Sequence, residues 1–174
     1  MKKFLFAAVG LLFATVAARA ALPLVGFYKT IDDNTNSAKS IVKLYDCGGN
    51  LCGRIVALFN ADGTEIEETI SNPVRVAEKL EGLPHMDGLD ILWNMSWDAR
   101  NNRFSGGRIM DPKDGRTYSA RVWADPDDAS LLRVRGSIGP FGRTQVWHVV
   151  NIADLPKDLQ KLDASKWEVV IPRQ

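Results

Sequence analysis

Short runs of β-forming residues recur along most of the chain, and Gly, Pro, Asn and Asp separate them. A new run begins roughly every ten residues, which is typical of an all-β sandwich or barrel. The runs that can be placed span residues 25–31, 39–46, 51–59, 89–97, 103–110, 116–124, 130–137 and 143–150. Most of them are joined by short turns that suit neighbouring antiparallel strands. We therefore predict an all-β fold, an eight-stranded antiparallel up-and-down barrel with one or two short helices.

The run over 89–97 shows the clearest alternation of apolar and polar residues. One face carries Leu89, Ile91, Trp93, Met95 and Trp97, and the other carries Asp90, Asn94 and Ser96. A period of two residues predicts that the first face is buried. By the same argument, Trp147 in the last run is predicted to face the interior together with Trp93 and Trp97.

Two segments interrupt the series of strands. Residues 72–82 carry an N-cap asparagine, a first-turn proline and a terminal glycine, which together indicate a short helix. In the tail, a helical turn is expected over 155–162. The last apolar stretch, 167–171, is expected either to add an edge strand or to pack across an open end of the barrel.

Residues 1–20 have the three parts of a secretory signal: two lysines, an apolar run over 4–18 and an Ala-Arg-Ala cleavage site that ends at Ala20. The apolar run is shorter than the roughly 20 residues needed to span a bilayer, and no second run of that length follows. We expect a soluble periplasmic or secreted product with no membrane span after cleavage. It would consist of a barrel domain, 21–152, and a tail, 153–174, that packs on or beside the barrel.

The charge balance argues against a nucleic-acid partner. Cleavage removes Lys2, Lys3 and Arg19 and no acidic residue, so the net charge falls from +1 to about −2. Binding to phosphates needs a clustered basic excess.

Cys47 and Cys52 are the only cysteines, and they flank a four-residue turn between two predicted strands. In an exported chain, an even pair is more often a disulfide than a metal or redox site. The spacing also does not fit a Cys-x-x-Cys motif. We therefore predict a disulfide, which closes so short a loop that it adds only about 2 kcal/mol and mainly fixes the hairpin register.

The sequence offers no catalytic signature. It lacks a Gly-x-Ser-x-Gly elbow, a His-Glu-x-x-His motif and a phosphate-binding glycine loop. His85 and His148 are far apart and are interpreted as ordinary surface or barrel-rim histidines. Asp111 and Asp114 stand where a tight turn uses aspartate for its own hydrogen bonds. We therefore predict no catalytic residue, no metal site and no cofactor.

Several basic side chains fall on neighbouring predicted strands: Arg108, Arg116, Arg121, Arg133, Arg135 and Arg143. We interpret all of them except Arg143 as lining the solvent face and pairing with nearby acids. The alternative is that some of them point inward to meet an acidic head group.

Three stretches together closely resemble a bacterial family known as domain of unknown function 2147 (DUF2147). They are Ser-Gly-Gly-Arg-Ile-Met-Asp-Pro-Lys-Asp-Gly-Arg-Thr-Tyr over 105–118, Leu-Arg-Val-Arg-Gly over 132–136 and Phe-Gly-Arg-Thr-Gln-Val-Trp over 141–147. The Cys-Gly-Arg-Ile-Val stretch that begins at Cys52 and the Asn-Pro pair at 72–73 fit as well. The resemblance covers most of residues 22–150.

This resemblance implies an exported, lipocalin-like barrel, and it implies no known activity. Lipocalin-like chains often open the first strand with Gly-x-Trp, whereas this chain has Tyr28 in place of the tryptophan. Such barrels also often lay a late basic side chain over the first-strand aromatic ring. An Arg143 stack on Tyr28 is therefore expected, with a contribution of about 1 kcal/mol.

The interior of an eight-stranded barrel is just wide enough to be filled by side chains or to hold one small ligand. The candidates that line or plug it are Tyr28, Trp93, Met95, Trp97, Tyr118, Arg143 and Trp147. Our first hypothesis is a non-enzymatic extracytoplasmic binding protein for a small, mainly apolar ligand. The second is an envelope protein-interaction module on a solid barrel, with contacts through loops 60–88 and 138–142. An uncharacterised enzyme is third.

Overall fold

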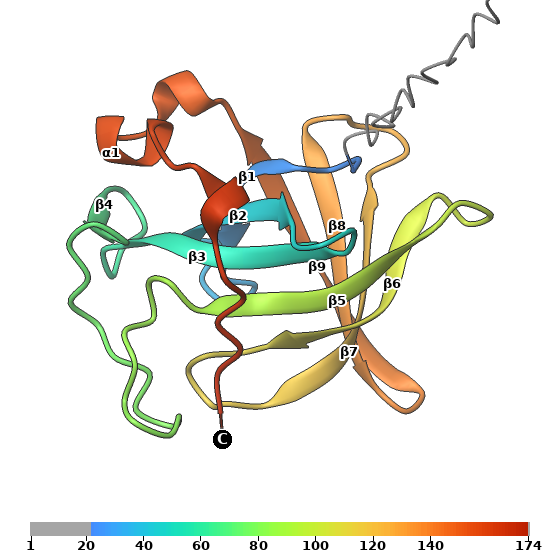
Figure 1. The fold of residues 1–174 in the computed structure, drawn as a ribbon, viewed down its shortest axis with the longest axis horizontal. Helices are drawn as coiled ribbons and strands as arrows, with labels where there is room; N and C mark the ends of the chain where they lie inside the picture. The colour runs from blue at the N-terminus through green and yellow to red at the C-terminus, as the bar shows by residue number, and fades with distance from the viewer. Residues whose placement is uncertain (1–21, 174) are drawn as a thin grey trace, which may run out of the picture.

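The strands of this protein form one continuous antiparallel sheet in the computed structural model, which describes residues 22–173. The predicted signal peptide, 1–20, lies outside the described residues. The strands are β1 (Gly26–Ile31), β2 (Ala38–Asp46), β3 (Leu51–Phe59), β4 (Ile66–Thr69), β5 (Asp90–Asp98), β6 (Arg103–Met110), β7 (Thr117–Ala124), β8 (Leu131–Ile138) and β9 (Phe141–Val150). Figure 1 shows them curving around a common interior.

The sheet closes into a barrel because β2 pairs with both β1 and β3. Eight strands form the ring, and β4 lies outside it, paired with β3 alone. The predicted eight-stranded antiparallel barrel is therefore confirmed, and the predicted runs coincide with the ring strands apart from small differences at their ends. The short strand β4 was not predicted.

One end of the barrel is filled by packed side chains. Met95 and Phe104 are fully buried there, and the rings of Trp97 and Phe104 lie 5.0 Å apart. Tyr28 is also buried, and its hydroxyl donates to the carbonyl of Leu24 at 3.0 Å. This end is plugged by the chain itself.

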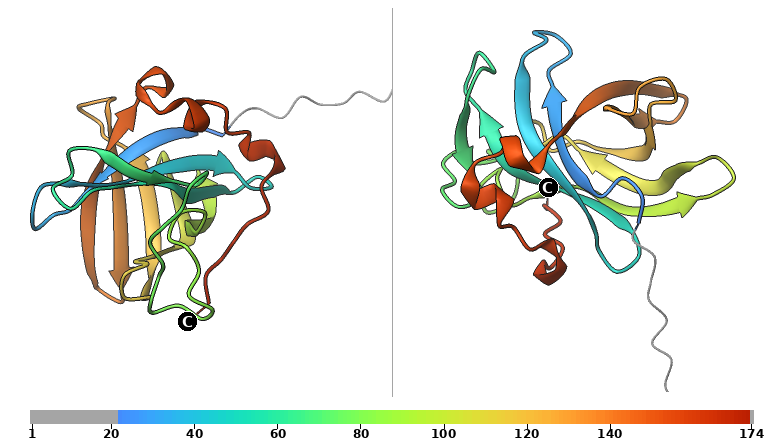
Figure 2. Two further views of the ribbon diagram at one scale, coloured as in Figure 1. Left: turned by 90° about the vertical axis from the view of Figure 1, so that its left-hand side faces the viewer. Right: turned by 90° about the horizontal axis from the view of Figure 1, so that it is seen from above.

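The C-terminal segment covers part of the outer wall. After β9 it forms η1 (Ile152–Asp154), α1 (Lys157–Gln160) and η2 (Ala164–Lys166). Leu155 and Leu159 pack against outward-facing side chains of β1, β2 and β3, among them Phe27 and Val56. Figure 2 shows the segment passing over these strands on the outside of the barrel. Nearly all of β3 is consequently buried on both faces.

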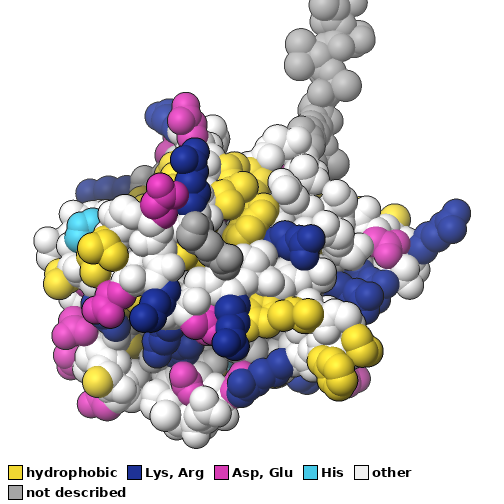
Figure 3. All heavy atoms as spheres, turned by 90° about the horizontal axis from the view of Figure 1, so that it is seen from below, with side chains coloured by type: hydrophobic (Ala, Val, Ile, Leu, Met, Phe, Trp, Pro, Cys, Tyr) yellow, Lys and Arg dark blue, Asp and Glu magenta, His cyan; other side chains and the backbone are white. Residues whose placement is uncertain are grey.

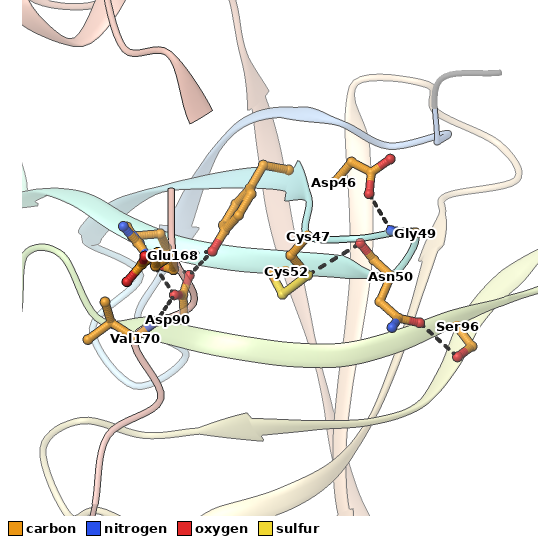
Figure 4. The surroundings of a disulfide bond; sticks show 11 residues. Asp46, Cys47, Gly49, Asn50, Cys52, Asp90, Ser96, Glu168 and Val170 are labelled. Atoms are coloured by element: carbon orange, nitrogen blue, oxygen red, sulfur yellow. Dashed lines mark hydrogen bonds and ion pairs between the residues drawn. A yellow bond between two sulfur atoms is a disulfide. The ribbon is translucent and has the colours of Figure 1, made fainter. Parts of the chain in front are cut away.

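A buried ion pair fastens the end of this segment to the wall. Asp90 of β5 is completely buried, and its carboxylate accepts from Arg54 at 2.6 Å and from the Tyr45 hydroxyl at 2.8 Å. The same carboxylate accepts from the backbone N–H of Val170 at 2.7 Å, and the Arg54 guanidinium donates to the carbonyl of Glu168 (Figure 4). The tail is therefore held by a paired charge rather than by strand pairing.

The disulfide between Cys47 and Cys52 closes the β2–β3 turn (Figure 4). Inside the turn, Asp46 accepts from the backbone N–H of Gly49 at 2.6 Å, and Cys47 N–H donates to the carbonyl of Asn50 at 2.9 Å. The turn is thus fixed both covalently and by its own hydrogen bonds.

Two local expectations are wrong and a third is confirmed. Residues 72–82 form no helix, because the segment pairs with the residues that follow it: Val76 forms a β-bridge with His85, and the Ala77 N–H donates to the Pro84 carbonyl at 2.8 Å. The stretch 167–171 forms no strand and lies on the outer wall, because Arg54 and Asp90 hold it there. A helical turn does form within 155–162, as α1.

The alternation in β5 also holds only in part. Trp93 and Met95 are buried as predicted, but Trp97 at the plugged end is 37% exposed. Asp90, predicted on the solvent side, is buried because the tail covers it. Within residues 22–173, no helix has the length and apolar character needed to cross a membrane.

Candidate ligand cavity

The end of the barrel opposite the plug is hollow. A cavity of about 640 Å³ extends inward from the turns that join β1 to β2, β6 to β7 and β8 to β9. Pockets that hold small ligands commonly measure about 300 to 1,000 Å³. The barrel is therefore filled by side chains at one end only, and the remaining space matches that of one small molecule.

The deep wall of the cavity is apolar. Alternate residues of the strands point inward, which brings Ile55, Ile91, Ile109, Val134 and Trp147 to the cavity surface. Trp147 is 1% exposed and forms part of the inner wall. Such a surface favours burial of apolar ligand atoms over contact with water.

A row of hydrogen bonds runs along β9 from the inner wall to the mouth. Trp147 donates its indole N–H to Gln145 at 3.3 Å, and Gln145 donates to Asp33 at 3.2 Å. Asp33 also pairs with Arg143, 2.7 Å away. A second polar spot is the hydroxyl pair of Thr30 and Ser40, 2.7 Å apart. These groups give the cavity a small number of fixed polar contacts.

Charges of both signs surround the mouth. Lys39 and Asp32 lie 3.8 Å apart. The backbone N–H of Asn34 is the main group that holds the pKa of Asp32 below its ordinary value, with help from Lys39 and Lys113. Figure 3 shows that basic and acidic side chains likewise occur together over the face seen from below. The mouth therefore presents balanced charge.

The structure separates the predicted ligand-binding residues into two groups. Tyr118, Arg143 and Trp147 line the cavity. Tyr28, Trp93, Met95 and Trp97 do not line it. Whether the first group binds a ligand stays a prediction.

The expected stack of Arg143 on Tyr28 is wrong. Arg143 pairs with Asp33 at the mouth, whereas Tyr28 lies on β1 opposite Val149, far along β9 from Arg143. The cation–π contacts within residues 22–173 instead join Lys43 to Phe27 and Arg54 to Tyr45 and Trp167.

Sequence reasoning missed the polar lining and the contribution of a distant loop. Thr30, Ser40 and Gln145 were unremarkable as single residues, although each occupies an inward position of a predicted strand. Arg75 and Met86 come from the irregular segment between β4 and β5, and no local pattern places them at the cavity. The alternation of inward and outward positions along the strands could have identified the three polar residues. It could not have identified Arg75 and Met86.

Two buried carboxyl groups lie in this segment and in the strand before it. Asp87 is 6% exposed and Glu68 is 3% exposed. Burial, followed by the neighbouring charge of Glu68, raises the pKa of Asp87 to about 7. Neither residue lines the cavity, so the pair does not face the space a substrate would occupy. Among the described residues, no cluster of three or more His, Cys, Asp or Glu side chains could hold a metal ion.

Comparison with solved structures finds a similar barrel in protein HP1028 from Helicobacter pylori, which is described as belonging to the lipocalin family. The two chains are 18% identical, with a TM-score of 0.60, over 80% of this chain and 90% of that chain. This similarity shows a lipocalin-like fold. No curated protein matches the chain.

The family comparison covers the barrel itself. Residues 26–149, from the start of β1 almost to the end of β9, match the model of a family described as "uncharacterized protein conserved in bacteria (DUF2147)". The match ends before the C-terminal segment that covers the outer wall. The chain therefore belongs to the DUF2147 family.

Proposed function

We propose that this protein is a non-enzymatic, extracytoplasmic carrier that binds one small, mainly apolar molecule in its barrel cavity. The observation that carries the proposal is the cavity of about 640 Å³, open at one end and apolar in its depth. A lipocalin-like barrel is suited to holding a small ligand, although fold alone does not define function. Export is supported by the secretory signal predicted for residues 1–20 and by the disulfide, which suits an oxidising compartment.

The expected affinity follows from the buried area. Burying about 400 Å² of apolar ligand surface contributes roughly 10 kcal/mol, and association costs at least about 4 kcal/mol of it. The remaining 6 kcal/mol or so corresponds to a dissociation constant of tens of micromolar. A polar group that reaches Arg143 would tighten this value.

Fluorescence titration with the apolar dye N-phenyl-1-naphthylamine tests the carrier. We expect saturable one-to-one binding that Ile109→Trp weakens at least about tenfold, because the larger ring fills the cavity. Val149→Trp is the matched control, since Val149 is 49% exposed and does not line the cavity. Absence of saturable binding up to the solubility limit, or equal effects of the two variants, would rule out this site.

A second candidate function, protein interaction through the mouth loops, is favoured by exposed apolar side chains. Phe141 is 81% exposed and Ile138 is 60% exposed on the β8–β9 turn. Isolated exposed apolar residues are common, so the pair needs a direct test. A photo-crosslinker at Phe141 should yield a discrete adduct in cells that the same group at exposed Asn101 does not; identical patterns would remove this candidate.

A further inference from the structure

The segment between β4 and β5, residues 70–89, contains no regular helix or strand and contributes Arg75 and Met86 to the cavity lining. We name it the clasp loop; it is drawn in green in Figure 1. Met86 N–H donates to the Arg75 carbonyl at 2.9 Å, which joins the two residues that line the cavity. Near the end of the loop, the Gly88 N–H donates to the Ile55 carbonyl at 2.9 Å.

Glu68 of β4 holds the first half of the clasp loop. One carboxylate oxygen accepts from the N–H groups of Val74 and Arg75, each at 2.7 Å, and the other accepts from the Arg75 guanidinium. Burial opposes the charge of Glu68, but the hydrogen bonds from Arg75 and Val74 prevail and lower its pKa. Arg75 also donates to the Phe59 carbonyl at 2.8 Å, so the loop is tied to β3.

Asp87 lies in the second half of the clasp loop, next to Met86. Both of its carboxylate oxygens are buried and have no hydrogen-bond partner among the described residues. The charged groups that act on it are Glu68 from β4 and Arg75 from the loop itself. Glu67 contacts Arg75 at 3.4 Å. The Arg75 guanidinium therefore acts electrostatically on both buried carboxyl groups, but it is bonded to Glu68 and not to Asp87.

We propose that Asp87 and Glu68 are a pH-dependent clasp, which holds the 70–89 loop against the cavity mouth while Asp87 is protonated and loosens the loop when both are charged. Loss of the proton to solvent leaves two like charges buried beside one arginine. Movement of Asp87 towards water relieves that repulsion and carries Met86 away from the cavity. The clasp goes beyond the carrier function and can be measured without any ligand.

The size of the effect follows from linkage. An ordinary aspartate has a pKa of 3.8, and burial raises that of Asp87 to about 7 in the closed loop. Between these values the open loop binds fewer protons than the closed one, so opening becomes more favourable by up to about tenfold per pH unit. Above about pH 7 both forms are ionised, and the opening equilibrium levels off.

Amide hydrogen exchange between pH 5 and pH 8, corrected for the chemical exchange rate, measures this equilibrium. We expect opening at residues 74–88 to rise by up to about a hundredfold from pH 5 to pH 7 and then to stay constant, with β7 and β8 unchanged. Asp87→Asn, which keeps the shape without the charge, should give a loop protected at every pH. A flat profile in the wild type, or an unchanged rise in Asp87→Asn, would overturn the clasp.

Two controls separate Asp87 from other groups of the loop. Glu78→Gln removes an equal charge from an exposed position of the same loop and should leave the profile unchanged. His85→Gln should also leave it unchanged, which matters because histidine side chains ordinarily change charge between pH 5 and 8. If either variant lost the rise in loop opening with pH, the replaced residue, and not Asp87, would be responsible for the pH dependence.

A direct titration keeps the proposal testable if Asp87→Asn does not fold. The ¹³C carboxyl signal of Asp87 in the wild type should titrate near pH 7, together with the loop amides; a midpoint near 4 would refute the clasp. Dye titration at pH 5 and pH 8 then links the clasp to the cavity. Failure of the dye to bind at any pH would reject the carrier alone, because the exchange data judge the clasp independently.

Discussion

Gly107 in β6 is the residue at which the barrel wall has the least room. A β-carbon there would overlap the backbone of Trp93 and Asn94 and the sulfur of Met95 on the neighbouring strand β5. Backbone atoms cannot yield as a flexible side chain can. The second glycine of the Gly-Gly pair in this strand therefore has a packing reason.

We predict that Gly107→Ala lowers the free energy of unfolding by about 2 kcal/mol, the usual cost of overpacking a closed site. Gly136→Ala is the matched control, because a β-carbon there meets the Ile109 methyl group at 3.3 Å and nothing nearer. Urea unfolding followed by circular dichroism measures both. Equal stability of the two variants would contradict the assigned close approach.

Among the secondary-structure elements, the strands could be predicted from the sequence. The segment that covers their outer face could not. Alternation over 89–97 and the turns between runs depend on residues close in sequence, and they placed all eight ring strands. The unbroken apolar run over 55–59 is also a local signal that both faces of β3 are covered. Which segment covers it depends on contacts such as Arg54 with Glu168, 114 residues apart.

The candidate site was also predictable only where it depends on local alternation, and not where it depends on contacts between distant residues. The alternation of inward-facing and outward-facing side chains placed Trp147 on the inner wall. Strand propensity could not tell that Trp93, Met95 and Trp97 lie away from the cavity. The helix expected over 72–82 failed for a related reason. A helix this short is marginal on its own, and Val76 and Ala77 instead pair with His85 and Pro84.

The C-terminal segment should depend on Leu159 for its attachment. This side chain is fully buried against β1 to β3, so Leu159→Ala leaves a void and should cost about 2 to 4 kcal/mol of segment attachment. Limited proteolysis should then cut after β9 in the variant, while Lys161→Ala, at an exposed position, behaves as the wild type. Resistance of Leu159→Ala to cleavage would show that other contacts hold the segment.

The disulfide should contribute less to stability than the attachment of the C-terminal segment does. It closes a four-residue turn that already has its own hydrogen bonds, so Cys47→Ala should lower the unfolding free energy by only about 2 kcal/mol. The folded circular dichroism spectrum should be unchanged. Loss of the fold in this variant would mean that the bridge organises the barrel and does not merely fix the turn.

For the whole molecule, the carboxyl groups make stability depend on pH in two opposite directions. Glu68 and Asp32 have lowered pKa values, so their contribution is present above the ordinary carboxyl range and is lost as the pH falls below about 4. Asp87 has a raised pKa, so the folded state binds its proton more tightly than the unfolded state does. Its contribution is present below pH 3.8 and is lost as the pH rises through about 7.

We therefore predict that stability is greatest near pH 4 to 5 and declines towards pH 7. A pKa that rises from 3.8 to about 7 would cost about 4 kcal/mol if the site were rigid. Opening of the clasp loop limits the loss, because an open loop returns Asp87 to water while the barrel stays folded. In Asp87→Asn the decline should disappear, whereas Glu78→Gln should retain it. Urea unfolding at half-unit pH intervals measures the decline in stability in each variant. A decline that persists in Asp87→Asn would place the responsible proton on another group.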